Sequence, residues 1–316
     1  MIKLIFLGIL SGAFFSTTFI LNEVMSLDGG HWVWSASLRY LFMSLFLTLI
    51  ILFQGGTARL KGVIALFFSH WRFWIIAGGI GFGGFYALIC FSADRCPGWV
   101  IAATWQFTVV ASLFVFMGFG NSFPKRVWFF SLIIFSDVVL VNLSQTQDIH
   151  FKGLIQGGLP VLLAAFCYPF GNQLVWEAAN GSHKKVPQIK SRLLNNVFNK
   201  VWLMTLGSFP LWAVLVIVVS PPAPAISQWM NAGAVALFSG IFATGIFLFA
   251  RTLASNANEL AAVDATQSSE VVFALAGGLV FLGTQAPDRT AIIGLLMILS
   301  GLIFFIKYQK TKDKKP

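Results

Sequence analysis

Charged residues are scarce in this 316-residue chain, because Asp, Glu, Lys and Arg together make up only 10% of it. Soluble domains carry roughly 25% of such residues, so the charged surface that keeps a protein dissolved in water is missing. In its place, 57% of the residues are hydrophobic and the mean hydropathy is +0.82. The composition excludes a soluble enzyme, a disordered chain and a coiled coil, and it is typical of an integral membrane protein.

Cysteine, histidine and the common catalytic motifs are also sparse or missing. Cys90, Cys96 and Cys167 show no disulfide framework, and the four histidines are scattered without metal-ligand spacing. No Walker A, Gly-x-Ser-x-Gly or His-Glu-x-x-His pattern occurs along the chain. We therefore expect neither an enzyme nor an ATPase, and no cofactor and no bound metal.

Apolar runs of membrane-spanning length divide the chain. A span needs about 20 mostly apolar residues, and charges or prolines mark where each run ends. The cluster Pro221, Pro222 and Pro224 separates two such runs, since proline stops a helix. The sequence predicts ten helices, at approximately 4–22, 32–53, 73–93, 98–118, 127–145, 153–176, 201–220, 233–250, 260–282 and 290–305.

The basic residues, which give a net charge of +10, lie mostly between the predicted spans and in the tail. If the N-terminus is inside, 17 Lys and Arg face the cytoplasm, 3 face outward and Arg39 lies within a span. This asymmetry predicts a multi-pass protein of the inner (plasma) membrane with both termini in the cytoplasm. Basic residues in such positions favour contact with lipid headgroups, so we expect no nucleic-acid partner.

An internal repeat appears when the chain is shifted by 162 residues against itself. The register continues without a gap from the third and fourth predicted spans onto the eighth and ninth. Matching pairs include Gly78 with Gly240, Gly83 with Gly245, Phe85 with Phe247, Ala103-Thr104 with Ala265-Thr266, and Val109-Val110 with Val271-Val272. We interpret this as two five-helix repeats, at 1–146 and 147–306, followed by a basic tail at 307–316. Since five is odd, the second repeat enters the membrane in the opposite sense, as in many secondary transporters.

The chain resembles the drug/metabolite transporter superfamily, whose ten-helix members contain two EamA-like repeats, and most of all its multidrug resistance efflux group. The resemblance covers nearly the whole chain. It implies a secondary carrier that exports small organic compounds, cations among them, and that is coupled to protons or to exchange. The features that carry it are Gly8, Gly12, Ala13 and Ser16 in the first span, Ser37–Tyr40 around Arg39, the glycine-rich third span, Ile101–Ala103, Asn258–Ala262 and Gly294–Gly301.

Ionisable residues at membrane depth are the main candidates for chemistry, because each costs about 3 kcal/mol or more at the centre of a span. Glu270 lies near the middle of the predicted ninth span, and Gln267 lies between it and Asp264 on one helical face. We expect Glu270 to couple transport and Asp264 to act as relay; the alternative is a carboxylate that fixes helix packing. Asp137 fits a packing or interface role as well as a functional one. We expect Arg39 to compensate a carboxylate or to cap a polar network.

Aromatic and amide side chains complete the predicted site. We expect Trp105, Gln106, Tyr86, Gln267 and Glu270 to line a pocket built mainly by the third, fourth, eighth and ninth spans. An aromatic face attracts a desolvated cation, which suits a small organic substrate. Two other functions remain open: a metabolite carrier for an amino acid, nucleobase or choline-like compound in either direction, and a lipid-linked sugar flippase or structural membrane partner. The protein is a monomer or a homodimer in this interpretation.

Overall fold

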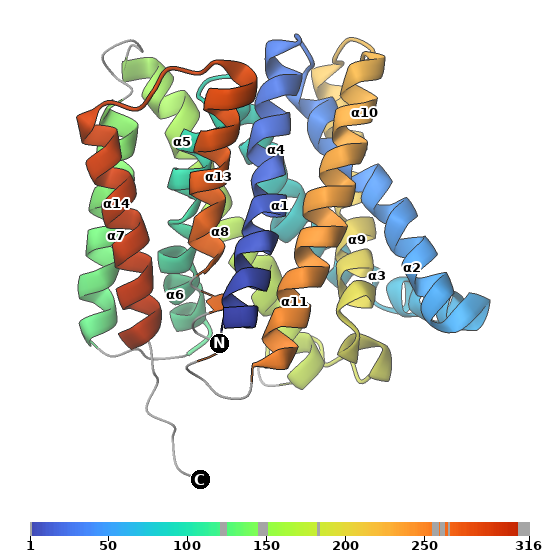
Figure 1. The fold of residues 1–316 in the computed structure, drawn as a ribbon. Helices are drawn as coiled ribbons and strands as arrows, with labels where there is room; N and C mark the ends of the chain where they lie inside the picture. Colours follow the sequence, from blue (N-terminus) through green and yellow to red (C-terminus); the bar gives the residue numbers. More distant parts are fainter. Residues whose placement is uncertain are drawn as a thin grey trace.

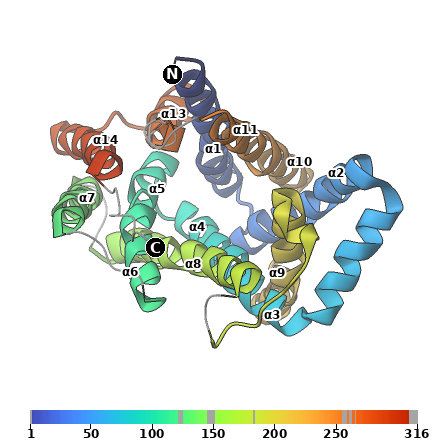
Figure 2. The same ribbon diagram turned by 90° about the horizontal axis from the view of Figure 1, so that it is seen from below.

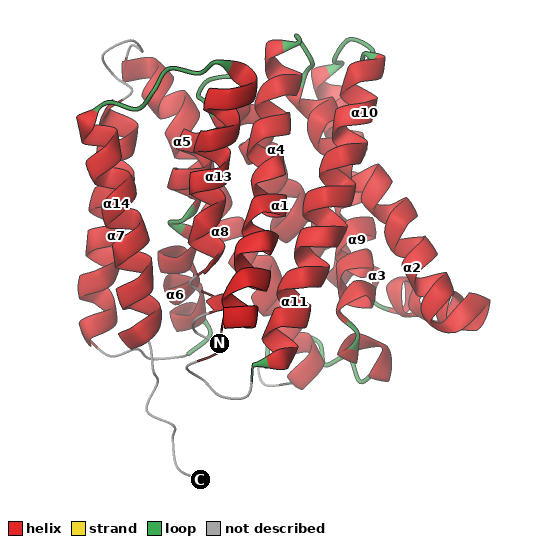
Figure 3. Ribbon diagram, viewed as in Figure 1, coloured by secondary structure: helices red, strands yellow, loops and turns green. Residues whose placement is uncertain are grey.

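The computed structural model of the protein describes residues 2–120, 125–144, 151–181, 184–254, 259, 263–264 and 266–308. Every regular element within these residues is a helix, joined by short loops (Figure 3). This confirms the predicted all-helical class. An apolar chain in lipid satisfies its backbone polar groups inside each segment, and helices do this without a partner strand.

Seven helical stretches are long and apolar enough to cross a membrane, and two shorter apolar helices follow among the described residues. The chain is therefore a multi-pass membrane protein, while the count of ten stays a prediction. The seven stretches are Ile2–Leu27, Trp32–Ser69, Trp71–Ala93, Gly98–Gly118, Gln156–Asn180, Val197–Val219 and Ile226–Leu253, and the shorter two are Thr266–Leu282 and Arg289–Gly301.

The first part of the chain runs up and down through the bundle (Figure 1). Helix α2 bends at Gly55 and Gly56, where Gly56 has φ +64°, and its last part projects away from the other helices (Figure 2). Only glycine adopts this left-handed conformation without a steric penalty. The elements are α1 (Ile2–Leu27), α2 (Trp32–Ser69), α3 (Trp71–Gly78), η1 (Gly79–Gly84), α4 (Phe85–Ala93), α5 (Gly98–Trp105), α6 (Thr108–Gly118) and α7 (Lys125–Ser144).

The second part begins with a long helix and ends beside α7 (Figures 1 and 2). Helix α9 ends at Val219, directly before the predicted proline break, and α10 begins at Ile226 rather than near 233. Helices α7 and α14 pack against each other along one side of the bundle. The elements are α8 (Phe151–Asn180), η3 (Arg192–Asn195), α9 (Val197–Val219), α10 (Ile226–Val235), η4 (Ala236–Ala243), α11 (Thr244–Leu253), η5 (Thr266–Ser268), α13 (Ser269–Gly277), η6 (Gly278–Leu282) and α14 (Arg289–Tyr308).

Two of the predicted spans are interrupted where we expected continuous helices. The stretch 98–118 breaks at Gln106 and Phe107, whose backbone N–H groups bond three residues back. The stretch at 266–282 starts with the 3₁₀ turn η5. Glu270 therefore lies in the first turn of α13 and not at the middle of a continuous helix, which corrects the prediction. The hydroxyl of Thr266 bonds to the Val263 carbonyl at 2.6 Å, and such local side-chain bonds compete with regular helix.

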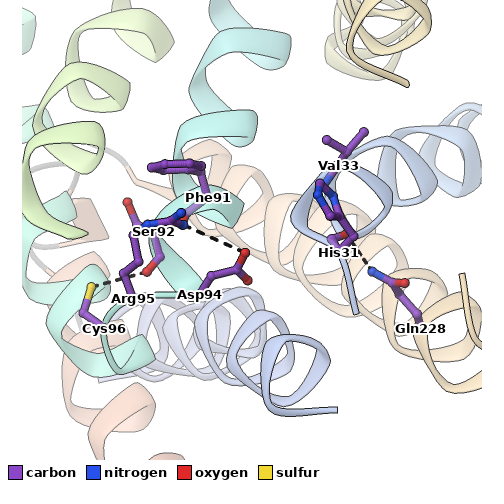
Figure 4. Close-up of polar contacts among 8 residues, drawn as sticks. All are labelled: His31, Val33, Phe91, Ser92, Asp94, Arg95, Cys96 and Gln228. Atoms are coloured by element: carbon purple, nitrogen blue, oxygen red, sulfur yellow. Dashed lines mark hydrogen bonds and ion pairs between the residues drawn. The ribbon is translucent and has the colours of Figure 1, made fainter. Parts of the chain in front are cut away.

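The loops at the end of the bundle opposite the start of α1 are tied by polar contacts (Figure 4). Arg95 donates to the Phe91 carbonyl at 2.7 Å and lies 3.9 Å from the Asp94 carboxylate. Gln228 donates to the His31 carbonyl at 2.9 Å, which joins the start of α10 to the start of α2. Partial burial raises the pKa of Asp94 above its ordinary value. These bonds hold the loops without any ligand.

Glycines allow α3 and α9 to pack backbone against backbone. A side chain at Gly207 would collide with the Trp74 carbonyl, and one at Gly78 would collide with the Met204 carbonyl. Small residues at helix crossings permit this close approach in membranes, where dispersion contacts replace the hydrophobic effect between helices. The α3–α9 contact thus depends on the absence of two methyl groups.

We expect Gly207→Ala to destabilise the protein by about 1–3 kcal/mol, because the added methyl forces α3 away from α9. Gly245→Ala is the matched control, since nothing lies within 4 Å of the position that its Cβ would occupy. Unfolding by denaturant in mixed micelles measures both. Equal stability of the two variants would show that the crossing tolerates a methyl group.

Candidate functional site

A cavity of ≈ 670 Å³ lies among α1, α2, α4, α5, α6, α8 and the helices from η4 to α13. This volume is within the ~300–1,000 Å³ typical of small-molecule sites. Aromatic side chains form part of its wall, with Phe82, Phe85, Trp105, Phe116, Tyr168 and Trp176 among the lining residues. The cavity accordingly suits a ligand with an apolar body and a few charged or polar groups.

Glu270 supplies one of the two carboxyl groups in this wall, and Asp264 supplies the other. Gln106 donates from Nε2 to the Oε1 of Glu270 at 2.6 Å, and the same nitrogen lies 3.3 Å from the Ala102 carbonyl oxygen. Both side chains are almost fully buried, with exposed fractions of 6% for Glu270 and 4% for Gln106. The two interrupted stretches meet here, since Gln106 follows α5 and Glu270 lies in the first turn of α13.

Arg39 of α2 lies in the same wall. Its guanidinium carbon is 4.0 Å from the centre of the Tyr86 ring, and its Nη2 is 3.5 Å from the Ser239 hydroxyl. The other two nitrogens, Nε and Nη1, are buried without a hydrogen-bond partner among the described residues. The cation thus lies against the Tyr86 ring and beside the Ser239 hydroxyl.

Tyr86 does not line the cavity, although we expected it there. It is fully buried, and Asn22 of α1 donates to its hydroxyl at 3.0 Å. The ring supports Arg39 instead of facing the cavity. The sequence singled out Tyr86 as an intramembrane aromatic residue but could not show which neighbour its face would meet.

Asp264 and Gln267 lie in the cavity wall together with Glu270. The carboxylate of Asp264 accepts a hydrogen bond from Arg251 of α11 at 2.8 Å, and both side chains are partly exposed. The Nε2 of Gln267 is buried and has no partner in the described part of the chain. The predicted residues Trp105, Gln106, Asp264, Gln267 and Glu270 are thus brought together, whereas Tyr86 stands behind them.

Helix α8 contributes residues that we did not assign to the site. Tyr168, Asn172 and Gln173 line the cavity, and the Tyr168 ring lies 5.8 Å from that of Trp105. Tyr168 was visible in the sequence as one of few intramembrane tyrosines, but the repeat register did not include its span. Asp137 lies on α7, and its side chain is outside the described residues. No group of three metal-ligating side chains occurs in the described part.

Comparison with known proteins places this cavity in a functional context. A family described as "Putative multidrug resistance efflux transporter" (EmrE) matches residues 2–311. The chain belongs to this family. It is therefore a multi-pass transporter of the membrane, as the sequence resemblance predicted, and its family is one of efflux proteins rather than enzymes. A small-molecule substrate and a lipid bilayer are the partners that such a protein requires.

Two relatives span most of the chain. "Uncharacterized protein YjlA" of Bacillus subtilis (strain 168) is 37% identical over 330 residues, covering 99% of this chain and 97% of that protein. An "Uncharacterized 42.1 kDa protein in intracellular alkaline protease 3'region" of Shouchella clausii is 34% identical over 282 residues, covering 85% of this chain and 70% of that one. A solved structure entitled "Crystal structure of protein" has a TM-score of 0.61 at 14% identity and covers 97% of both chains, which shows the fold alone.

We expect Gln106 and Glu270 to be coupled in stability. Gln106→Met leaves a buried carboxyl oxygen without its donor, and Glu270→Met leaves the buried Gln106 amide with only the longer bond to the Ala102 carbonyl, so each costs about 1–3 kcal/mol. The double variant replaces both partners by apolar groups and should lose less than the sum. A double-mutant cycle by denaturant unfolding in micelles at pH 7.5 measures the coupling, which we expect to reach about 1 kcal/mol.

The matched control pairs Gln106→Met with Glu23→Met. Glu23 is also buried and accepts from the backbone N–H of Gly98 at 2.7 Å, but it does not line the cavity. The losses in this pair should add, because the two groups share no hydrogen bond. Additivity for Gln106 and Glu270 as well would mean that their hydrogen bond contributes nothing to the fold.

Proposed function

We propose that the protein is a secondary active transporter that exports small organic compounds by alternating access, with Glu270 as the coupling group. The observation that carries the proposal is a buried carboxyl group, hydrogen-bonded to the amide of Gln106, in the wall of a cavity that aromatic side chains also line. Intramembrane ionisable groups mark substrate and ion pathways in transporters. The absence of a nucleotide-binding motif from the sequence also favours a gradient as the energy source.

The coupling follows from competition for one carboxylate. A carboxylate shielded from water is stabilised when it gains either a proton or the cationic group of a substrate. If only one of the two binds at a time, inward movement of the proton accompanies outward movement of the substrate. Raising the pH removes the proton, so binding of a cation strengthens toward alkaline pH and weakens in acid. The other charged or titratable groups in the wall are Arg39, Tyr40, Tyr168, Arg251 and Asp264.

The helix interruptions support the proposed pair of inverted repeats at 1–146 and 147–306. The interruption at Gln106 and the end of η5 at Ser268 are separated by 162 residues, the offset of the sequence repeat. The third and eighth predicted spans both contain a π-helical segment, η1 and η4. Broken helices that meet near a substrate site are typical of transporters built from inverted repeats. In this arrangement α7 and α14 are the last helices of the two repeats.

The orientation that we propose places both termini in the cytoplasm of a bacterial-type plasma membrane. The start of α1 and the end of α14 lie at the same end of the bundle, together with η3 (Figure 1). The segment 184–200 carries five of the basic residues at this end, Lys184, Lys185, Lys190, Arg192 and Lys200. Positive charge concentrates on the cytoplasmic side of membrane proteins.

Cysteine labelling tests this orientation. In a background without Cys90, Cys96 and Cys167, we expect Lys190→Cys to react with a membrane-impermeant maleimide only after the cells are permeabilised. The exposed residue Gln285 lies between η6 and α14 at the other end of the bundle, so Gln285→Cys should react in intact cells. The opposite pattern would reverse the orientation.

Glu270→Gln tests the coupling. The amide keeps nearly the same volume, so the fold should be retained, but it can exchange neither a proton nor a cation. We expect proteoliposomes to take up a quaternary ammonium probe, with or without a carboxylate, when the lumen is acidified. Glu270→Gln should lose about 90% or more of the pH-driven uptake, equivalent to roughly 1.4 kcal/mol of transition-state stabilisation.

Glu23→Gln is the matched control, because it changes a buried carboxyl group outside the cavity. It should keep the pH-driven uptake. A Glu270→Gln variant that transports at the rate of the wild type, with the same pH dependence, would make Glu270 a structural residue and place the coupling elsewhere.

A further inference from the structure

Four charged side chains line the cavity within the described residues: Arg39, Arg251, Asp264 and Glu270. Arg251 and Asp264 neutralise each other through their ion pair. Arg39 and Glu270 have no ion-pair partner in the part of the chain that the structure describes. The cavity therefore keeps one cation and one carboxyl group that no other protein charge balances.

The surroundings of Arg39 do not satisfy its guanidinium. The exposed fraction of the side chain is 7%, and two of its three nitrogens are buried without an acceptor. The titratable groups that face it are Tyr40 from its own helix, Tyr86 and Cys90 from α4, and Tyr168 from α8, which are uncharged at neutral pH. An arginine is not deprotonated in proteins, so the charge and the open donors persist together.

An arginine kept only for packing would normally have these donors filled. Its Nη2 lies at hydrogen-bond distance from Ser239, at 3.5 Å, and the Ser239 hydroxyl oxygen also accepts from Thr18 at 2.6 Å. Ser239 and Thr18 both line the cavity, so the guanidinium stands at the polar part of the wall. A planar guanidinium donates two parallel N–H groups to the two oxygens of a carboxylate, and here Nη2 can do so together with either of the unpartnered nitrogens, Nε or Nη1.

We propose that Arg39 is the subsite for a carboxylate group of the substrate. The inference rests on the proposed transport function and specifies its substrate class: zwitterions whose carboxylate binds Arg39 and whose cationic nitrogen competes with the proton at Glu270. One guanidinium balances one negative charge, so the anionic group is monovalent. Tyr168 lines the cavity together with Arg39 and Glu270, and the aromatic side chains beside it receive the apolar body.

Three probes of matched shape test the substrate class. They are N,N,N-trimethylphenylalanine, which carries both charges, phenylethyl-trimethylammonium, which lacks the carboxylate, and 3-phenylpropionate, which lacks the nitrogen. Uptake into proteoliposomes at several concentrations gives a half-saturating concentration for each. We expect that of the zwitterion to be at least about tenfold below those of the other two, since hydrogen bonds to charged groups are strong.

Three arginine variants separate the carboxylate subsite from other roles. Arg39→Gln should reduce the preference for the zwitterion over the cation to within about twofold, because the charged hydrogen bonds are lost. Arg39→Lys keeps a positive charge and should keep part of the preference. Arg95→Gln is the matched control, since Arg95 also packs on an aromatic ring, with its guanidinium 3.7 Å from the Phe91 ring centre, but lies outside the cavity wall.

The outcomes distinguish this inference from the transport function itself. Uptake that depends on Glu270 but shows no preference for the zwitterion in the wild type overturns the carboxylate subsite and leaves the transporter intact, even if Arg39→Gln fails to fold. An Arg39→Gln variant that weakens zwitterion and cation equally also overturns it, because Arg39 is then only a countercharge. If no probe shows Glu270-dependent uptake, the proposed function fails first, and the substrate class fails with it.

Discussion

The shortage of water inside a bilayer governs this structure. Backbone polar groups must be paired within each segment, so the described elements are helices, and a charge that leaves water must find a partner or serve a purpose. The protein follows this rule at Glu23, whose carboxylate accepts from the Gly98 backbone. It also follows it in the pair of Arg251 and Asp264. Arg39 and Glu270 are the positions where a buried side chain has only some of the partners that a charge out of water needs.

The same constraint explains how the helices that form the cavity wall are held together. Between lipid-embedded helices the hydrophobic effect contributes little, so packing depends on close approach at small residues. Gly78 and Gly207 lock α3 against α9, and Gly81 and Gly171 bring η1 against α8. These contacts hold the helices that carry Phe82 and Tyr168. The aromatic wall is thereby built on parts of the bundle where even one added methyl group would collide with a neighbour.

The sequence was sufficient to predict the helical class, the proline break after Val219 and five of the residues that line the cavity, Trp105, Gln106, Asp264, Gln267 and Glu270. The helix interruptions at Gln106 and Ser268 were not predictable. An apolar run indicates a helix, but it does not show where a backbone N–H group bonds to the carbonyl three residues back instead of four. The position of Tyr86 behind Arg39 was also missed. Which neighbour a side chain faces depends on how the helices cross, and a single sequence contains no distances between helices. The predicted pairing of halves remains a proposal that the shared register supports.

Near the two interruptions, positions that correspond in the repeats we propose carry different side chains. At the 162-residue offset Thr108 corresponds to Glu270, and both line the cavity. The Thr108 hydroxyl donates to the Ala165 carbonyl of α8, a neutral bond, whereas Glu270 accepts from Gln106. Two carboxylates at these positions would repel each other, and one of them would stay protonated. In the two repeats that we propose, only one of these positions therefore carries a carboxyl group. The other carboxyl group of the wall, Asp264, is paired with Arg251, so within the described residues Glu270 is the one without an ion pair, which suits exchange of a proton for a substrate.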